Sequence, residues 1–294
     1  MNEFEQQKFT GERAQYFAKD TIYKNCEFLE GESPLKHAKN LKIFNSSFKY
    51  KYPLWNTENV QVKDCVFYEL SRSGLWYVKN FSMEDSLIIA PKEFRQSSDI
   101  SLKNVTFKDA SETFWNCSKI KLENVKAKGD YFALNSVDFF AENFELEGNY
   151  FLDGGKNIEI HNAKLISKDS FWNCENVSIY DSYIVGEYLA WNSKNVKFVN
   201  CTIESNQGLC YIDGLKMENC KLINTDLAFE YSTKIDAEIK SSIVSVKNPC
   251  GGKIYADEIG TLIMNPARCD VGSTEIICDK IGQKFTEDPN VNEH

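Results

Sequence analysis

A short unit of about 19 residues recurs along most of this chain, and it constrains the fold more than any other feature. In its clearest form the unit reads like residues 40–48, N-L-K-I-F-N-S-S-F. The clearest copies start at Asn40, Asn59, Asn80, Asn157, Asn176 and Asn195. A unit this short cannot bury an apolar face alone, so successive copies must stack on one another. The spacing predicts about twelve stacked coils.

Each copy carries a pattern for short β-strands. Apolar residues stand one, three and eight positions after the first residue, as Leu41, Ile43 and Phe48 do. Alternation of this kind is typical of strands. The fifth position is Asn or Asp in nearly every copy, which suits a sharp corner because these residues tolerate left-handed backbone. Asn-Gly turn pairs and a repeated helical stretch are missing, which excludes a hairpin meander and a leucine-rich repeat. The pattern predicts an all-β, single-stranded parallel β-helix, which is a solenoid.

The repeat also predicts the domain boundaries. Residues 1–19 precede the first copy, and we expect them to cap the N-terminal end of the stack, because an open end exposes unpaired backbone. Residues 20–244 hold the repeats. The period decays afterwards, so residues 245–282 are predicted to form the C-terminal coils and cap, and residues 283–294 a disordered tail.

Composition excludes several classes of function. The formal net charge is −9 and no basic run occurs, which disfavours binding to nucleic acid or anionic membranes. The chain has neither an apolar signal core nor a run of 18 apolar residues. Its ten cysteines include no C-x-x-C pair, and we expect free thiols in a cytoplasmic protein. Three histidines leave little material for a zinc site or a Ser-His-Asp triad.

All five tryptophans fall in one column of the repeat, four positions before the first residue of a copy. They are Trp55, Trp76, Trp115, Trp172 and Trp191. Lys36, Arg95 and Asp153 occupy the same column in other copies, and such residues do not belong in a dry core. The column is therefore predicted to be a partly exposed stripe. It would serve either to stack sugar rings or to bury another protein surface.

A second column of acidic and amide side chains lies a few residues earlier. Three copies share a Gly-Asp/Asn/Glu-Tyr tripeptide that ends at Tyr131, Tyr150 and Tyr188. The column itself comprises Glu112, Asp130, Asn149, Asp169, Glu187, Gln207 and Asp226. Carboxylates on neighbouring coils would suit a glycosidase pair, and Asp130, Asp169, Glu187 and Glu112 are the candidates for it. A bound Ca²⁺ or a salt-bridged, solvated turn are the alternatives.

The chain resembles an uncharacterised microbial family known as a domain of unknown function. The resemblance rests on FTGERA, GESPLK, YKYPLW, RSGLWY, APKEFR, KGDYF, GNYFLDG, SFWNCENV, GEYLAWNSKNV, QGLCYIDGL and TDLAFEYS, and it covers roughly residues 9–280. It implies a right-handed parallel β-helix, similar in fold to pectate lyases and polygalacturonases, and it brings no established activity. The polygalacturonase motifs N-T-D, D-D, G-H-G and R-I-K are absent as a set. Arg72 or Arg95 beside the acids could imitate the catalytic arginine of a pectate lyase.

Three functions follow from these patterns. The leading hypothesis is recognition of an oligo- or polysaccharide by the five tryptophans together with Tyr131, Tyr150 and Tyr188. The first alternative is a glycoside hydrolase or polysaccharide lyase that uses Asp130, Asp169 or Glu187, with Glu112 and Arg72 as further candidates. The second alternative is a scaffold that forms homo-oligomers through its tryptophan column. No cofactor is predicted apart from Ca²⁺ at the acidic column.

Overall fold

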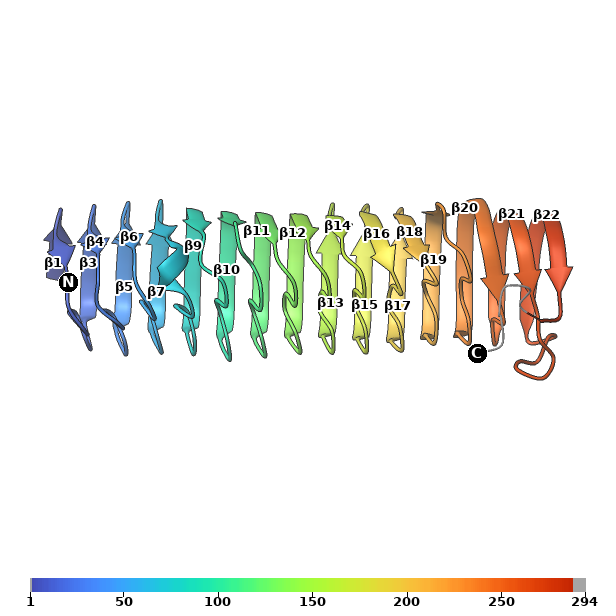
Figure 1. The fold of residues 1–294 in the computed structure, drawn as a ribbon, viewed down its shortest axis with the longest axis horizontal. Helices are drawn as coiled ribbons and strands as arrows, with labels where there is room; N and C mark the ends of the chain where they lie inside the picture. The colour runs from blue at the N-terminus through green and yellow to red at the C-terminus, as the bar shows by residue number, and fades with distance from the viewer. Residues whose placement is uncertain (1, 288–294) are drawn as a thin grey trace. The chain divides into compact units, whose positions relative to one another are not determined.

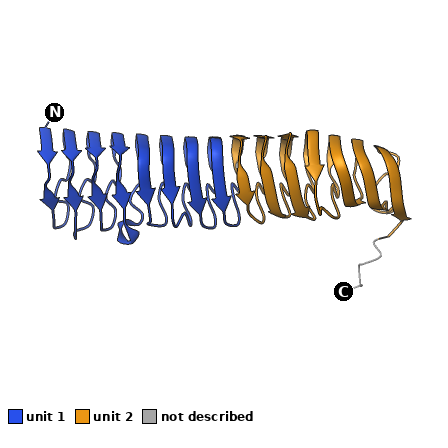
Figure 2. Ribbon diagram, turned by 90° about the horizontal axis from the view of Figure 1, so that it is seen from above, with its two compact units in different colours: residues 1–152 blue, residues 153–294 orange. Residues whose placement is uncertain are grey.

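The structure is a computed structural model that describes residues 2–287. It divides into two compact units, residues 1–152 and residues 153–294, coloured separately in Figure 2. Both units are built from parallel strands stacked in chain order, with one coil of the chain on the next (Figure 1). Apart from one short 3-10 turn, no helix occurs among the described residues. The predicted parallel β-helix is therefore confirmed.

Most coils carry one long strand or two short strands separated by a corner. Unit 1 contains β1 (Asn2–Glu5), β2 (Lys8–Phe9), β3 (Lys19–Lys24), β4 (Glu27–Phe28), β5 (Lys39–Phe44), β6 (Ser47–Phe48), β7 (Glu58–Lys63), β8 (Val66–Phe67), the 3-10 turn η1 (Glu69–Ser71), β9 (Lys79–Ile88), β10 (Ser98–Phe107), β11 (Ser118–Lys128) and β12 (Val137–Glu147). Unit 2 contains β13 (Lys156–His161), β14 (Lys164–Ile166), β15 (Glu175–Tyr180), β16 (Tyr183–Glu187), β17 (Lys194–Val199), β18 (Thr202–Asn206), β19 (Asp213–Leu222), β20 (Thr233–Lys247), β21 (Gly252–Ile263) and β22 (Thr274–Phe285).

The number of coils is larger than the predicted dozen. Counting one coil for each of β1, β3, β5, β7 and β9 to β12 gives eight in unit 1. Counting β13, β15, β17 and β19 to β22 gives seven in unit 2. The three additional coils start at β1, β21 and β22, which pair in parallel with β3, β20 and β21. These coils lack the Asn-led motif, so the sequence pattern did not reveal them.

Both terminal segments contribute strands to the stack, which was expected of residues 245–282 as C-terminal coils but not of residues 1–19 as a cap. β1 and β2 lie within residues 1–19, and β2 pairs with β4 in the same parallel sense as the later coils. β21 lies within residues 245–282, and β22 begins there and runs on to Phe285. Residues 288–294 of the predicted tail lie outside the described residues.

The repeat positions explain the core. Leu41, Ile43 and Phe48 are each at most 1% exposed, as the alternation predicts. In unit 1 the rings of Phe28, Phe48 and Phe67 stack coil on coil, with centroids 4.7 and 4.6 Å apart. The ten cysteines are free thiols, and seven of them are buried. Cys26, Cys65, Cys201 and Cys220 lie in the core, as the small sixth position of the repeat indicates.

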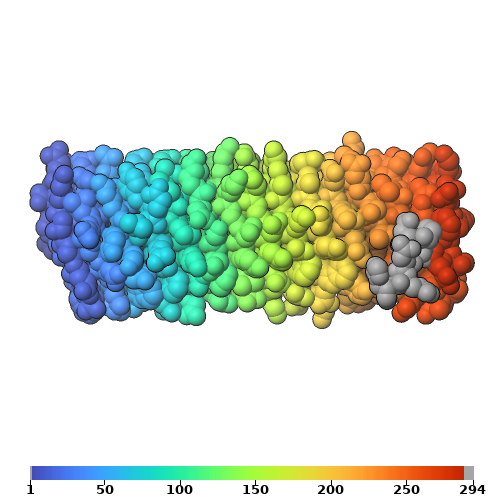
Figure 3. Space-filling model, in the orientation of Figure 1, coloured from blue at the N-terminus to red at the C-terminus, as the bar shows by residue number. Residues whose placement is uncertain are grey.

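Asparagine ladders hold the corners. The fifth-position residues adopt left-handed backbone, for example Asn45 with φ of 46°. Their amides bond from coil to coil, and Asn124 Nδ2 donates to Asn104 Oδ1 over 2.9 Å. A second ladder of side-chain amides runs through the first position of the repeat. There Asn59 donates to Asn40 over 2.9 Å, and Asn80 donates to Asn59 over 2.8 Å. Residues one coil apart are thus surface neighbours within each unit, and the colours of Figure 3 follow the chain in successive bands.

Candidate functional site

The tryptophans of unit 1 form a stack with basic side chains. All three are half-buried. The ring centroids of Trp55 and Trp76 are 5.0 Å apart, and Lys36 Nζ lies 5.6 Å from the Trp55 centroid. The Arg95 guanidinium lies between Trp76 and Trp115, at 4.8 and 4.2 Å from their centroids. The predicted column therefore exists in unit 1, and its basic members are inserted between or beside the indoles.

The tryptophans of unit 2 are also half-buried and in mutual contact. The centroids of Trp172 and Trp191 are 6.3 Å apart, with Tyr188 in edge contact with both rings. Tyr211 lies 4.6 Å beyond Trp191. The Trp172 indole N–H donates to the carbonyl oxygen of Tyr188 over 2.8 Å.

This packing restricts how a ligand could use the indoles. Sugar rings bind aromatic side chains through the ring face. The faces of Trp55 and Trp76 are occupied by one another and by Lys36 and Arg95. The Trp76 indole N–H donates to the carbonyl oxygen of Lys92 over 2.7 Å. Sugar stacking on the tryptophans stays a prediction, and other aromatic rings offer more open faces.

The three tyrosines of the shared tripeptide divide between the units. In unit 1, Tyr131 and Tyr150 stack with centroids 4.6 Å apart and planes inclined by 6°, and Tyr131 is 42% exposed. The Trp115 indole N–H donates to the Tyr131 carbonyl oxygen over 2.7 Å. In unit 2, Tyr188 lies beside Trp172 and Trp191 as described above. Part of the Tyr131 ring is therefore accessible, whereas Tyr150 and Tyr188 are half-buried.

The acidic candidates of unit 1 are engaged in structural contacts. Glu112 forms ion pairs with Arg95 and with Lys92, the latter at 3.0 Å. Asp130 Oδ1 accepts the backbone N–H of Asn149 over 2.8 Å. Arg72 is exposed and has no ion pair among the described residues. Glu112 is therefore held in a structural ion-pair cluster with two basic side chains.

Asp169 and Glu187 of unit 2 lie on neighbouring coils. The backbone N–H of Asp169 donates to the Glu187 carbonyl oxygen over 2.9 Å, and Lys168 Nζ lies 2.8 Å from Glu187 Oε1. Burial, and then the negative charge of Glu187, raise the pKa of Asp169 above its ordinary value. A raised pKa is one property of a general acid, and Asp169 has it.

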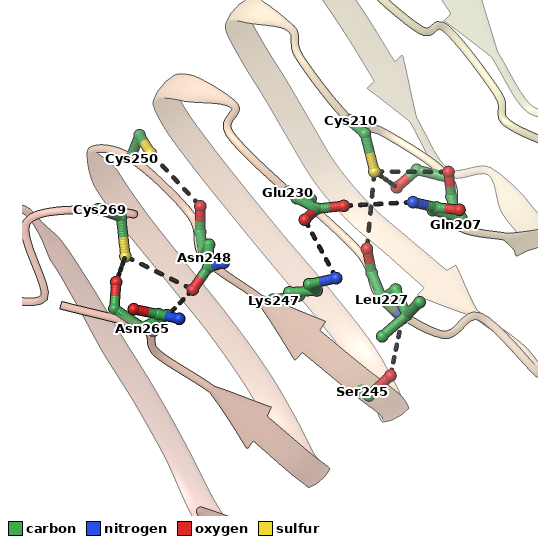
Figure 4. A network of polar contacts seen from close by, with 11 residues as sticks. Gln207, Cys210, Leu227, Glu230, Ser245, Lys247, Asn248, Cys250, Asn265 and Cys269 are labelled. Atoms are coloured by element: carbon green, nitrogen blue, oxygen red, sulfur yellow. Dashed lines mark hydrogen bonds and ion pairs between the residues drawn. The ribbon is translucent and has the colours of Figure 1, made fainter. Parts of the chain in front are cut away.

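The tryptophan column of unit 2 leads into a buried polar network, drawn in Figure 4. Lys247 Nζ lies 3.2 Å from Glu230 Oε1, and their side chains are only 15% and 8% exposed. Gln207 Nε2 donates to Glu230 Oε2 over 3.2 Å. Burial raises the pKa of the neighbouring Cys210 thiol to about 12, so it is protonated and unreactive at neutral pH. The network therefore has the character of a structural ion pair.

Residues 2–287 contain no group of three or more His, Cys, Asp or Glu side chains arranged to hold a metal ion. The Ca²⁺ expectation for the acidic column stays a prediction. In the same range, no helix has the length and apolar character that crossing a bilayer would require.

A hollow on unit 1 brings together groups that sequence reasoning did not single out. Its volume is about 380 Å³, and it is lined by residues 17–19, 37, 39, 56–58, 77 and 79. We call it the N-terminal groove. Phe17 is 63% exposed and stacks on His37 with centroids 5.3 Å apart, and Tyr77 is 36% exposed. The repeat brings these four segments together because each lies one coil after the previous one.

His37 is neutral in this groove. Burial, and then the positive charges of Lys36 and Arg13, lower its pKa below the ordinary value of a histidine. Asn56 Nδ2 lies 2.7 Å from His37 Nδ1. An amide nitrogen only donates, so Nδ1 accepts and the ring proton lies on Nε2. His37 thus has a donor N–H on the side of the ring away from Asn56.

Sequence reasoning missed this groove for identifiable reasons. Phe17 and Lys19 fall in the segment assigned to a cap, and Lys39 and Lys79 stand just before the first residue of a copy, where no pattern was sought. The signal that could have found them is the run Lys19, Lys39, Glu58 and Lys79 at one repeat position in an acidic protein.

Comparisons with known proteins identify a family and distant structural likenesses. A family model described as Protein of unknown function (DUF3737) matches residues 2–277. No curated protein matches the chain. Among solved structures, the chain is similar to the surface protein and adhesin PfbA of Streptococcus pneumoniae, at 9% identity and a TM-score of 0.30, over 91% of this chain and 74% of that one.

Two further solved structures show likeness at the same level. The A-module of the mannuronan C-5 epimerase AlgE4 of Azotobacter vinelandii is 10% identical, with a TM-score of 0.24, over 91% of this chain and 79% of that one. The plasmid-mediated fluoroquinolone resistance protein QnrB1 is 12% identical, with a TM-score of 0.20, over 76% of this chain and 92% of that one. Likenesses this distant carry no information about activity.

Proposed function

This chain belongs to the DUF3737 family of proteins of unknown function, and from the geometry of its N-terminal groove we propose that it recognises carbohydrates. The observation that carries the proposal is the meeting of open aromatic rings and hydrogen-bonding side chains in one hollow of about 380 Å³. A hollow of this size lies within the range of small-ligand sites. A sugar presents an apolar C–H face and a rim of hydroxyls, so it needs both kinds of group.

Open rings would supply the apolar contact. One side of the Phe17 ring packs on His37, and 63% of the residue is exposed. Tyr77 lies at the other end of the groove and is 36% exposed. These two residues offer a sugar more accessible ring surface than the stacked indoles of Trp55 and Trp76.

Polar groups would supply the specificity. The Asn56 amide, the His37 Nε2–H and the Lys ammonium groups can bond to hydroxyls. A second, smaller hollow of about 220 Å³ is lined by residues 40–42, 59–61, 80 and 82 of the same coils. Its amides from Asn40, Asn59, Gln61 and Asn80 suit a further sugar unit, which favours an oligosaccharide over a single sugar.

Titration calorimetry with a panel of neutral and charged oligosaccharides tests the proposal. We expect Phe17→Ala to weaken every ligand that binds by about 2- to 10-fold, because it removes a ring contact. Tyr183→Ala is the matched control, since Tyr183 is a 40% exposed aromatic residue of unit 2. The proposal fails if no saccharide binds, or if both variants behave alike.

A second candidate function has one observation in its favour. The raised pKa of Asp169 beside Glu187 is what a glycosidase needs in its general acid. Half-buried Trp172 and Trp191 lie along the same coils. Release of reducing ends from the panel, abolished in both Asp169→Asn and Glu187→Gln, would support hydrolysis. Activity that survives either change would remove these residues from the reaction.

A further inference from the structure

We infer that the N-terminal groove selects sugars that carry a negative charge, such as a carboxylate or a sulfate; this inference rests on the proposed carbohydrate recognition. The structural basis is the set of charged groups in the groove. Three lysines line it against a single carboxylate, Glu58. The whole protein has a net charge of −9, so this excess of positive charge runs against the overall composition.

Only one of the three lysines is neutralised. Lys39 Nζ lies 2.7 Å from Glu58 Oε2, and this pair satisfies both groups. Lys19 and Lys79 are exposed and form no ion pair among the described residues. His37 is neutral and adds no charge of its own. Three ammonium groups against one carboxylate leave a net excess of two positive charges, and Lys79 also lies within electrostatic range of Glu58.

The coil register fixes where these charges lie. Lys19 pairs with Lys39 across neighbouring strands, Lys39 pairs with Glu58, and Glu58 pairs with Lys79. The free cations thus flank the Lys39–Glu58 pair, one on each side. With strands about 4.8 Å apart, the backbones of Lys19 and Lys79 are separated by about 14 Å. That span suits an oligomer with charges on successive sugars better than a single anion.

The neighbouring groups favour a sugar over other anions. Phe17 offers an open ring next to Lys19, so a ligand that combines an apolar face with a charge fits there. The Asn56 amide and the His37 Nε2–H can bind hydroxyls between the two cations. An anionic patch on a second copy of the chain is the competing occupant, and light scattering at low salt would detect it as self-association.

The test compares charged and neutral ligands on the full chain. We would titrate the protein with three oligosaccharides of equal length at low and moderate salt. One is built of galacturonate, one of sulfated galactose and one of neutral galactose. We expect the charged oligomers to bind at least about tenfold more tightly than the neutral one at low salt, and the difference to shrink with added salt. The carboxylated and sulfated arms show which charged group the groove prefers.

Two double variants assign the effect to the groove. Lys19→Gln with Lys79→Gln should weaken the charged ligands by about 3- to 10-fold and the neutral ligand by clearly less, because glutamine keeps a donor for a hydroxyl but carries no charge. Lys164→Gln with Lys221→Gln removes the same charge from exposed positions of unit 2 and should change neither. All four residues are exposed, so folding should be intact, as thermal unfolding would verify.

Each remaining outcome is decisive. Equal affinity for charged and neutral oligomers overturns the inference and leaves carbohydrate recognition in place. Equal loss in both double variants also overturns it, because the attraction would then come from the total charge. The proposed function is overturned as well if none of the three oligomers binds and Phe17→Ala has no effect on any ligand of the wider panel. If the protein self-associates and Lys19→Gln with Lys79→Gln abolishes that association, the occupant of the groove is a second copy of the chain and not a sugar.

Discussion

Glu93 is the most unusual single residue of the core. It is fully buried, and its Oε2 accepts the backbone N–H groups of Gly74 and Leu75 over 2.8 and 2.9 Å. Gly74 and Leu75 follow the irregular turn η1. Their N–H groups are bonded by the Glu93 carboxyl oxygen and not by a backbone carbonyl of the next coil. Gly74 is required because a Cβ there would lie 2.8 Å from the Ser71 carbonyl oxygen. Glu93 Oε1 has no partner among the described residues.

Burial raises the pKa of Glu93 well above its usual range, against the lowering effect of the two N–H donors. The folded state therefore binds the proton more tightly than the unfolded state. The protein is therefore most stable at pH values below the pKa that the Glu93 carboxyl has in the unfolded chain. Its stability falls as the pH rises toward the higher pKa of this carboxyl in the folded chain. We expect Glu93→Gln to stabilise the protein at pH 8, because the amide keeps the acceptor for both N–H groups and has no proton to lose.

The gain should vanish near pH 4, where the wild-type carboxyl is protonated. Glu93→Leu is the complementary variant, since it leaves both N–H groups unpaired and should cost about 2–5 kcal/mol near pH 4, with a smaller cost at pH 8 where the wild type is itself less stable. Urea unfolding at several pH values measures all three proteins. A Glu93→Gln protein that is less stable than wild type at pH 8 would contradict the assignment of a buried, neutral acid.

Arg95 makes a second prediction at the residue scale. Its guanidinium covers the faces of Trp76 and Trp115 and pairs with Glu112. We expect Arg95→Ala to destabilise the protein by about 1–3 kcal/mol and to shift the tryptophan emission to longer wavelength. Arg95→Lys should recover little of the stability lost in Arg95→Ala, because a compact ammonium group cannot cover two indoles. Arg72→Ala is the control, and an equal effect of both alanine variants would contradict the stacked arrangement.

At the scale of the elements, the corners between strands depend on asparagine. Asn59 has φ of 57° and bonds to the amides of Asn40 and Asn80. Asn59→Ala should cost about 1–2 kcal/mol, chiefly because alanine is strained in left-handed backbone. Asn59→Gly removes the same amide without the strain and should cost less. If thermal unfolding ranks glycine below alanine, strain of alanine in left-handed backbone does not set the cost at this position.

The local pattern of each coil could be predicted because it depends on neighbours in the sequence. The alternation at Leu41 and Ile43, the corner at Asn45 and the outward placement of Trp55 all follow from the order of residues within one copy. The stacking of Arg95 between two indoles could not be predicted, because it depends on side-chain packing between three coils. Glu93 was missed for the same reason, since its partners belong to the irregular turn of the previous coil.

At the scale of the whole molecule, each unit is held together by contacts between adjacent coils. Phe48 lies in the ring stack between Phe28 and Phe67. We expect Phe48→Ala to cost about 3–5 kcal/mol. Amide exchange should accelerate most in β4, β6 and β8, and least in β10 to β12 of the same unit. Uniform acceleration through unit 1 would show that the unit opens as one cooperative body.

The repeat predicted the architecture but neither the number of coils nor the N-terminal groove. The coils at β1, β21 and β22 have strand pairing without the Asn-led motif, so a pattern search ended too early at both ends. The N-terminal groove combines residues from four coils, and no one of its segments is distinctive. Stacking order alone brings Phe17, His37 and Tyr77 to one hollow.

Amide exchange measured by mass spectrometry, with and without a galacturonate trimer, shows whether a saccharide binds in the N-terminal groove. Binding there should slow exchange in peptides that cover residues 15–20, 35–40, 54–59 and 75–80, and in no peptide of unit 2. Slower exchange confined to residues 167–192, or no change in any peptide at saturating trimer, would contradict it.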